Sequence, residues 1–265
     1  MRTAIGLSYD GSRFGGWQSQ PSGNTIQDCL EAAIAAIAGE PVRITGAGRT
    51  DAGVHALAQV AHFDFSGARP ASAWVRGVNS GLPPQIAVQW AVPVGDGFNA
   101  RFSAFERSYR YVLYNRPERP GLGAGYVGWF HHELDVARMH EAAQCLVGEH
   151  DFSAFRSSQC QAKSPVKQIK QVTVTRKGPY VQFDFRANAF LHHMVRNIVG
   201  CLVYIGKGKH APGWMGELLQ GRDRTLAAPT FAAAGLYLSR IRYEPHWHLP
   251  DFIRMMPFDP DCLAP

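Results

Sequence analysis

The chain has 265 residues, 46% of them hydrophobic, and its formal net charge is +6 with an isoelectric point near 9.2. No apolar stretch approaches the roughly 20 residues that a membrane-spanning helix needs, which argues against a membrane protein. The five cysteines are scattered and contain no C-x-x-C pair, which argues against a disulfide framework and a zinc site. With no signal-peptide pattern at the N-terminus, we expect a cytoplasmic protein.

The first part of the chain predicts strands and helices in alternation. Residues 3–9 are typical of a strand, and a helix is predicted from Thr25, with Asp28 completing a capping box and Gly39 ending the helix. The remaining predicted elements of this part are strands over 42–45, 57–65 and 87–92 and a short helix over 72–79.

The second part repeats this order at a coarse level. The predicted elements are a strand over 109–114, a helix over 136–147, a hairpin over 169–186, helices over 190–205 and 214–219, and a strand over 236–243. The pattern predicts an α+β protein with an N-terminal half (1–104), a C-terminal half (105–245) and a tail (246–265) without an assignable feature. Sequence identity between the halves is too low to establish a duplication.

The loop 46–56, GAGRTDAGVHA, places one carboxylate and one guanidinium among three glycines. Glycine allows backbone angles that other residues avoid and lets a ligand approach the chain closely. Asp51 is therefore the candidate catalytic residue. The alternative is an ordinary turn that carries a surface pair of Arg49 and Asp51, and composition alone does not decide between these interpretations.

The same loop resembles the active-site motif of the TruA family of tRNA pseudouridine synthases. Three further stretches resemble that family in the same chain order. They are SYDG with FGGWQ (8–18), YRY (109–111) and NAFLHHMVRN (188–197). Together the four stretches span most of the chain, which makes the resemblance far more specific than a lone RTD tripeptide.

The resemblance implies two RNP-like α/β halves that share a mostly antiparallel sheet, with the catalytic cleft between them. Asp51 would be the catalytic carboxylate, Tyr109 would stack on the extruded uracil, and Arg196 would keep Asp51 ionised. Arg49 is the alternative partner of Asp51, and in the family pattern it would hold the target nucleotide or the displaced base. Asp51 could attack the base, attack the sugar or start a glycal route. For Tyr109 the alternative is a strand aromatic that faces the core.

The resemblance also implies the substrate and the assembly. The substrate would be the anticodon stem-loop of tRNA, modified at uridines 38–40, and the enzyme would be a homodimer that needs no cofactor. Two groups of basic residues fit contact with phosphates, although solvated strand faces would carry the same residues. The groups are Arg101, Arg107, Arg110, Arg116 and Arg119, and Lys163, Lys167, Lys170, Arg176 and Lys177.

A metal site and two other functions are the alternatives to this interpretation. The histidines at 55, 192, 193, 246 and 248 could suggest a metal site, but they lack the H-x-x-x-H spacing of a helix pair, so we expect no metal. A noncatalytic RNA-binding module would need the basic residues and Tyr109 but would tolerate Asp51→Asn. A glycosidase-like hydrolase would need two facing carboxylates, and only Asp51 lies in such a loop.

Overall fold

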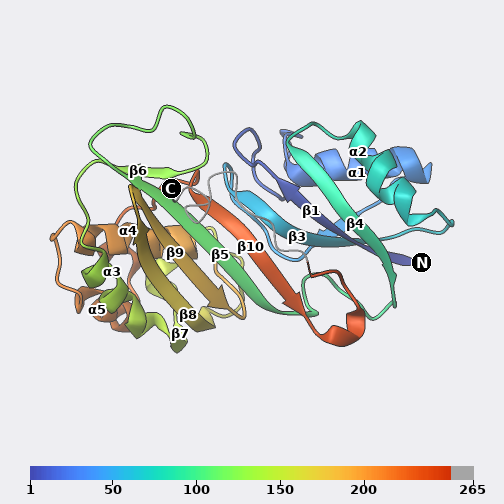
Figure 1. Cartoon of the computed structure of the whole chain (residues 1–265). Helices are drawn as coiled ribbons and strands as arrows, with labels where there is room; N and C mark the ends of the chain where they lie inside the picture. The colour runs from blue at the N-terminus through green and yellow to red at the C-terminus, as the bar shows by residue number, and fades with distance from the viewer. Residues whose placement is uncertain (252–265) are drawn as a thin grey trace. The chain divides into compact units, whose positions relative to one another are not determined.

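The computed structural model describes residues 1–251, which form two compact units (Figure 1). The first unit contains residues 1–105 and 237–251, and the second contains residues 106–236. The expected halves are continuous in sequence, whereas the first unit combines two separate segments. Of the expected tail, residues 252–265 lie outside the described part of the chain.

The first unit is a sheet with helices α1 and α2 side by side (Figure 1). In the strand order β4-β1-β3-β10, β1 pairs antiparallel with both neighbours, β10 runs parallel to β3, and β2 adds to β3. The strands are β1 (Arg2–Tyr9), β2 (Ile44–Gly46), β3 (His55–Asp64), β4 (Ile86–Val94) and β10 (Leu236–Tyr243). The helical segments are α1 (Ile26–Ala38), the π-helical turn η1 (Ala73–Gly77), α2 (Val78–Gly81) and η5 (Pro245–Trp247).

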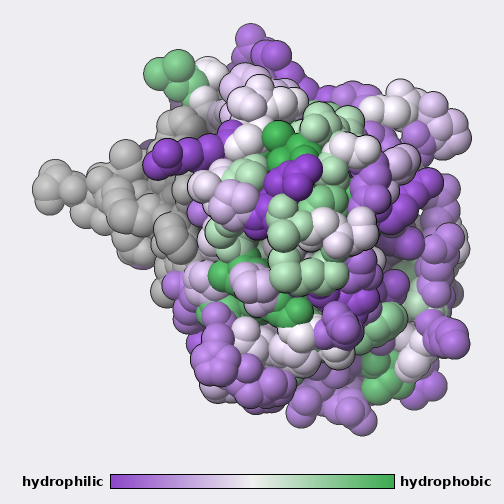
Figure 2. All heavy atoms as spheres, turned by 90° about the vertical axis from the view of Figure 1, so that its right-hand side faces the viewer, coloured by the Kyte–Doolittle hydropathy of each residue, from purple (hydrophilic) through white to green (hydrophobic). Residues whose placement is uncertain are grey.

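Two apolar clusters hold this unit together. Trp74 of η1 packs edge-on against Phe63 of β3, with ring centroids 5.0 Å apart. A second cluster is built on Val60 and the fully buried Phe98, and Trp247 of η5 packs against it. The described start of the expected tail therefore packs against the core of the first unit. Figure 2 shows hydrophobic residues toward the centre of one face of the molecule and hydrophilic residues around them.

The second unit has the strand order β5-β9-β8-β7, with antiparallel pairing throughout, and β6 adds parallel to β5. Its strands are β5 (Ala104–Asn115), β6 (Gly128–Phe130), β7 (Gly148–Asp151), β8 (Val166–Lys177) and β9 (Tyr180–Ala187). Its helices are α3 (Val136–Ala143), α4 (Met194–Gly206) and α5 (Trp214–Gly221), with 3-10 turns η2 (Gln144–Leu146), η3 (Ser153–Phe155) and η4 (Arg224–Leu226). The expected α+β class, with mostly antiparallel strands, is confirmed.

Several expected elements differ in detail. The helix expected over 190–205 begins only at Met194, because His193 has a left-handed backbone (φ 63°) that cannot continue an α-helix. The helix expected over 136–147 ends at Ala143 and continues as the 3-10 turn η2. Strands β6 and β7 were not expected. No helix within residues 1–251 has the length and apolar character that crossing a membrane requires.

Candidate active site

Asp51 lies in the loop that connects β2 to β3 in the first unit. Its side chain is half-buried, whereas Arg49 of the same loop is exposed. The backbone carbonyl of Asp51 accepts a hydrogen bond from the N–H of Val54 at 3.1 Å, and Gly53 between them has a positive φ of 77°. The loop therefore closes as a tight turn directly after Asp51, which requires glycine at position 53.

Buried side chains of the sheet fix the loop on the N-terminal side of Asp51. The hydroxyl of Tyr9 on β1 lies 2.8 Å from the hydroxyl of Thr50, and Gln59 of β3 donates from Nε2 to the carbonyl of Gly48 at 2.8 Å. Burial raises the pKa of Tyr9 to about 12, although hydrogen bonds from Thr50 and Gln59 act in the opposite direction. Tyr9 is consequently a neutral phenol at physiological pH, and its role here is to position Thr50, next to Asp51.

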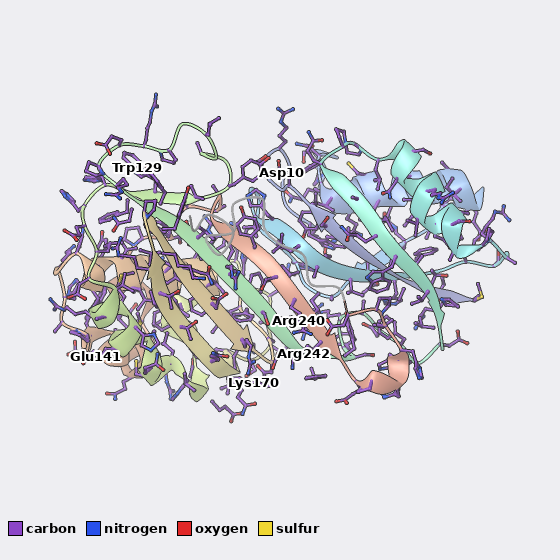
Figure 3. The ribbon with its side chains drawn as sticks, in the orientation of Figure 1. Asp10, Trp129, Glu141, Lys170, Arg240 and Arg242 are labelled. Atoms are coloured by element: carbon purple, nitrogen blue, oxygen red, sulfur yellow. The ribbon has the colours of Figure 1, made fainter. Side chains whose placement is uncertain are left out.

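The segment 10–17 forms the other support of the loop. The N–H of Trp17 donates to the carbonyl of Thr50 at 3.0 Å. Gly16 has φ 96°, and a Cβ there would lie 2.6 Å from the carbonyl oxygen of Thr50, so only glycine fits. Asp10, which follows β1 (Figure 3), accepts the N–H of Ser12 and starts this segment. The stretches 8–18 and 46–56, which the sequence singled out separately, are therefore in direct contact.

His55, at the start of β3, is also part of this support. Its Nδ1 accepts the backbone N–H of Gly11 at 3.1 Å, and its ring stacks on Tyr237 of β10 at 4.8 Å between centroids. The side chain is only 2% exposed. Its contacts therefore make His55 a structural residue of the first unit.

Tyr109 lies on β5 of the second unit, opposite Phe185 of β9. Its side chain is 8% exposed, and its ring packs edge-on against Phe190 with centroids 4.9 Å apart. An edge-to-face neighbour holds the Tyr109 ring in one orientation. The structure thus places Tyr109 as a fixed, mostly buried aromatic.

Arg196 lies in the first turn of α4, six residues after Phe190. Its Nε donates to the carbonyl of Phe231 at 2.8 Å, and the N–H of Phe231 donates to the carbonyl of Arg196 at 3.2 Å. This reciprocal contact fixes the direction of the guanidinium. Tyr109 and Arg196 are linked in the second unit through the segment that contains Phe190.

Several of the basic residues have protein partners. Arg110 pairs with Asp184 at 2.7 Å, and Lys170 on β8 (Figure 3) pairs with the buried Glu106 at 3.0 Å. Arg176 donates to the carbonyl of Leu134 at 2.8 Å. These three side chains have structural roles in the second unit, whereas Arg116, Arg119 and Lys163 are exposed.

The contacts also identify supporting residues to which the sequence analysis assigned no role. Tyr9 and Gln59 hold the Asp51 loop. Phe190 packs against Tyr109, and Phe231 accepts the hydrogen bond from Arg196. Tyr9 and Phe190 lie inside the quoted stretches, so the motif itself was the available signal. Gln59 and Phe231 lie outside every quoted stretch and become visible only through their hydrogen bonds. The role of Arg196 as the partner of Asp51 stays a prediction.

Comparison with known proteins matches the chain to the family described as tRNA pseudouridine synthase, over residues 7–103 and 142–244. The chain is similar to tRNA pseudouridine synthase A of Aromatoleum aromaticum, with 62% identity over 94% of this chain and 95% of the relative. The enzyme of the same name from Dechloromonas aromatica is 61% identical over 95% and 96% of the two chains. The one from Thiobacillus denitrificans is 58% identical over 97% and 99%.

Proposed function

Because the chain belongs to the tRNA pseudouridine synthase family, we propose that it converts uridines 38–40 of the tRNA anticodon stem-loop to pseudouridine, with Asp51 as nucleophile. Family membership itself makes the protein a tRNA-modifying isomerase. The positions in tRNA and the role of Asp51 are the proposed part. Its main support is the loop 46–56, in which hydrogen bonds from three separate segments hold Gly48 and Thr50, on the N-terminal side of a half-buried carboxylate.

The reaction needs an ionised carboxylate and little else. Pseudouridine formation breaks the bond between N1 of uracil and C1′ of ribose, turns the base in the pocket and joins C5 to C1′. The proton lost from C5 balances the proton gained at N1, so the reaction needs no redox cofactor and no energy input. Attack on the sugar, attack on the base and a glycal route all start from the same carboxylate of Asp51.

Tyr109 and Arg196 take supporting roles in this proposal. Tyr109 stacks on the extruded uracil, because an aromatic ring held in one orientation offers a flat face to a base that has left the helical stack. Arg196 is the cation that favours the ionised form of Asp51, and Arg49 holds the target nucleotide after it leaves the helical stack. The enzyme acts as a homodimer in the cytoplasm.

The experiment measures tRNA affinity and the rate of pseudouridine formation for the variant Asp51→Asn. The control variant is Asp96→Asn, which changes an exposed carboxylate of the same unit. We expect Asp51→Asn to bind tRNA with unchanged affinity and to form pseudouridine at least about 10⁴-fold more slowly, as for other enzymes that lose a catalytic group. The Asp96 variant keeps the normal rate. Normal turnover by Asp51→Asn would disprove the nucleophile assignment.

The position in tRNA is tested separately, by mapping pseudouridine in tRNA from cells with and without this protein. Loss of pseudouridine at positions 38–40 supports the proposal. Loss at other positions only would contradict the anticodon assignment and leave the isomerase activity intact. Free uracil among the products would instead indicate hydrolysis.

A further inference from the structure

The connection between β4 and β5 carries the Asn99–Ser103 turn, which exposes an aromatic ring on a rigid backbone. Phe102 in this turn is 78% exposed, although the neighbouring Phe98 and Ala100 are completely buried. The guanidinium of Arg101 lies over the Phe102 ring, 5.4 Å from its centroid. A large apolar side chain and a cation are thus presented together from the first unit.

The turn is fixed by its own hydrogen bonds. The side-chain oxygen of Asn99 accepts the N–H groups of Arg101 and Phe102 at 3.0 and 3.1 Å. The N–H of Ser103 donates to the carbonyl of Asn99 at 2.8 Å, and the Ser103 hydroxyl accepts the N–H of Asn99 at 3.0 Å. An Asn side chain that bonds the backbone two residues ahead replaces the flexibility of a loop with a defined turn.

The core beneath the turn anchors it further. The N–H of Ala100 donates to Nδ1 of His62, and the carbonyl of Ala100 accepts the hydroxyl of Tyr243 at 2.7 Å. Phe98 packs between His62, Tyr243 and Trp247. Figure 1 shows the connection beside η5, which contains Trp247. This anchoring explains how the turn is held, but it does not require an aromatic side chain at position 102.

A rigid exposed ring beside a guanidinium has the chemistry that recognises an unpaired nucleobase. Every base offers a flat face that stacks on an aromatic ring, and an adjacent Arg contacts the phosphate of the same nucleotide. Fixing the ring before binding lowers the entropy lost in the complex. A protein partner could use both side chains as well, since aromatic residues and Arg are enriched at protein interfaces. The net charge of +6 and the tRNA-modifying family of the chain favour RNA as the occupant.

We propose that the Asn99–Ser103 turn is a tRNA contact in which Phe102 stacks on a nucleobase and Arg101 pairs with a phosphate. The inference rests on the proposed function only in taking tRNA as the substrate. It is independent of which uridine reacts and of the role of Asp51.

The test measures tRNA affinity in equilibrium binding for Phe102→Ala, Phe102→Trp and the matched control Leu122→Ala. Leu122 is also a large exposed apolar residue, with 95% exposure, and lies in the second unit. Loss of one stacked base weakens binding by about 5- to 150-fold, so we expect Phe102→Ala to fall in this range. Phe102→Trp and Leu122→Ala should bind as the wild type does.

Two further measurements separate stacking from charge. The added Trp in Phe102→Trp should show fluorescence quenching when tRNA binds, beyond that of the wild-type protein. For Arg101→Ala, the slope of log affinity against log salt should become less negative by about 0.7–0.9, the value for one phosphate contact. For Phe102→Ala the slope should stay unchanged, because stacking releases no counterions.

Each contrary result has a definite meaning. Wild-type affinity of Phe102→Ala overturns the inference, whether or not pseudouridine forms in the anticodon stem-loop. A lower molecular mass of Phe102→Ala in sedimentation, with unchanged tRNA affinity, assigns the ring to contact with a second copy and also overturns it. Weakened tRNA binding together with pseudouridine outside the anticodon stem-loop would support the inference and contradict the proposed function.

Discussion

Gly16 shows how a single residue without a side chain can control the position of a catalytic loop. Alanine at this site would combine an unfavourable positive φ with a Cβ 2.6 Å from the carbonyl oxygen of Thr50. Gly23 is a matched control, because its φ is also positive, at 67°, but no atom lies within 4 Å of a built Cβ. The comparison isolates the effect of the close approach from that of the backbone angle.

We expect Gly16→Ala to lower both stability and activity. Gly23→Ala should cost only the strain of the left-handed backbone, about 1–2 kcal/mol in the free energy of unfolding. Gly16→Ala should cost more than this and lower kcat about 100-fold, since a displacement near 1 Å of a reacting group has that effect. Urea unfolding measures the stability of both variants, and single-turnover rates measure their activity. Equal losses of stability and activity in Gly16→Ala and Gly23→Ala would contradict a special role for the close approach at Gly16.

Tyr9 predicts how stability responds to alkaline pH. Its folded-state pKa of about 12 lies above the ordinary value of 10, so the folded protein keeps the proton over a range where the unfolded chain loses it. The stability contributed by the neutral phenol is complete below pH 10 and is lost as the pH rises to 12. The same reasoning applies to the buried thiol of Cys201, whose pKa is raised by burial from 9 to about 11. The stability that the neutral thiol contributes is lost between pH 9 and 11, which is lower than the range for Tyr9.

In Tyr9→Phe, the fall of stability between pH 10 and 12 should become smaller by about 2–3 kcal/mol, because no phenol remains to ionise. At neutral pH the variant should be less stable than the wild type by about 1 kcal/mol, through the lost hydrogen bond to Thr50. Unfolding in urea at a series of pH values measures both effects. If the free energy of unfolding of Tyr9→Phe fell between pH 10 and 12 as much as that of the wild type, Tyr9 would not titrate in this way.

At the scale of elements, the first turn of α1 is coupled to the Asp51 loop. Thr25 is the N-cap, with its hydroxyl accepting the N–H of Asp28, and the N–H groups of Ile26 and Gln27 donate to the carbonyls of Gly16 and Trp17. Trp17 in turn donates to Thr50. The start of one helix therefore positions the segment on which the loop rests.

Thr25→Ala should destabilise the protein by about 0.5–2 kcal/mol, the usual cost of an N-cap, whereas Thr25→Ser keeps the hydroxyl and should be close to the wild type. The first turn of α1 positions Trp17, which in turn bonds Thr50 of the Asp51 loop. We therefore also expect a lower rate of pseudouridine formation for Thr25→Ala. Thermal unfolding and single-turnover kinetics test the two expectations. A stable but slow Thr25→Ser variant would show that the methyl group matters instead.

The same elements show what the sequence could and could not predict. Helix α1 was predicted correctly with its cap and its end at Gly39, because capping and glycine termination are local signals. Strands β6 and β7, of three and four residues, are too short for alternation to appear, and their partner strands define them. The start of α4 was predicted four residues early because the apolar residues Phe190 and Leu191 precede the helix, whereas the backbone of His193 is left-handed.

For the candidate site, sequence reasoning found the loop of Asp51 but not its supports. The glycines around Asp51 are a local signal, and their reason is now visible at Gly53, where the chain turns. Gln59 and Phe231 act through hydrogen bonds to residues 11 and 35 positions away in the chain. No local pattern marks such partners, because the fold alone brings them into contact.

At the scale of the whole molecule, the net charge of +6 and the proposed homodimer give one further expectation. Sedimentation equilibrium should give twice the chain mass of 29.2 kDa at micromolar concentration.

The affinity for tRNA should fall steeply with salt, because a basic protein releases counterions from each phosphate that it neutralises. A monomer would contradict the proposed assembly, and a salt-independent affinity would contradict the phosphate contacts.

The hydrogen bonds of Thr50 and Gly48 also bear on the kinetics of tRNA association. Tyr9, Trp17 and Gln59 belong to the same folded unit as the loop, so we expect the backbone next to Asp51 to be ordered before RNA arrives. Stopped-flow mixing should therefore show no slow, concentration-independent phase from this part of the protein, and any waiting time before chemistry belongs to the unstacking of the nucleotide.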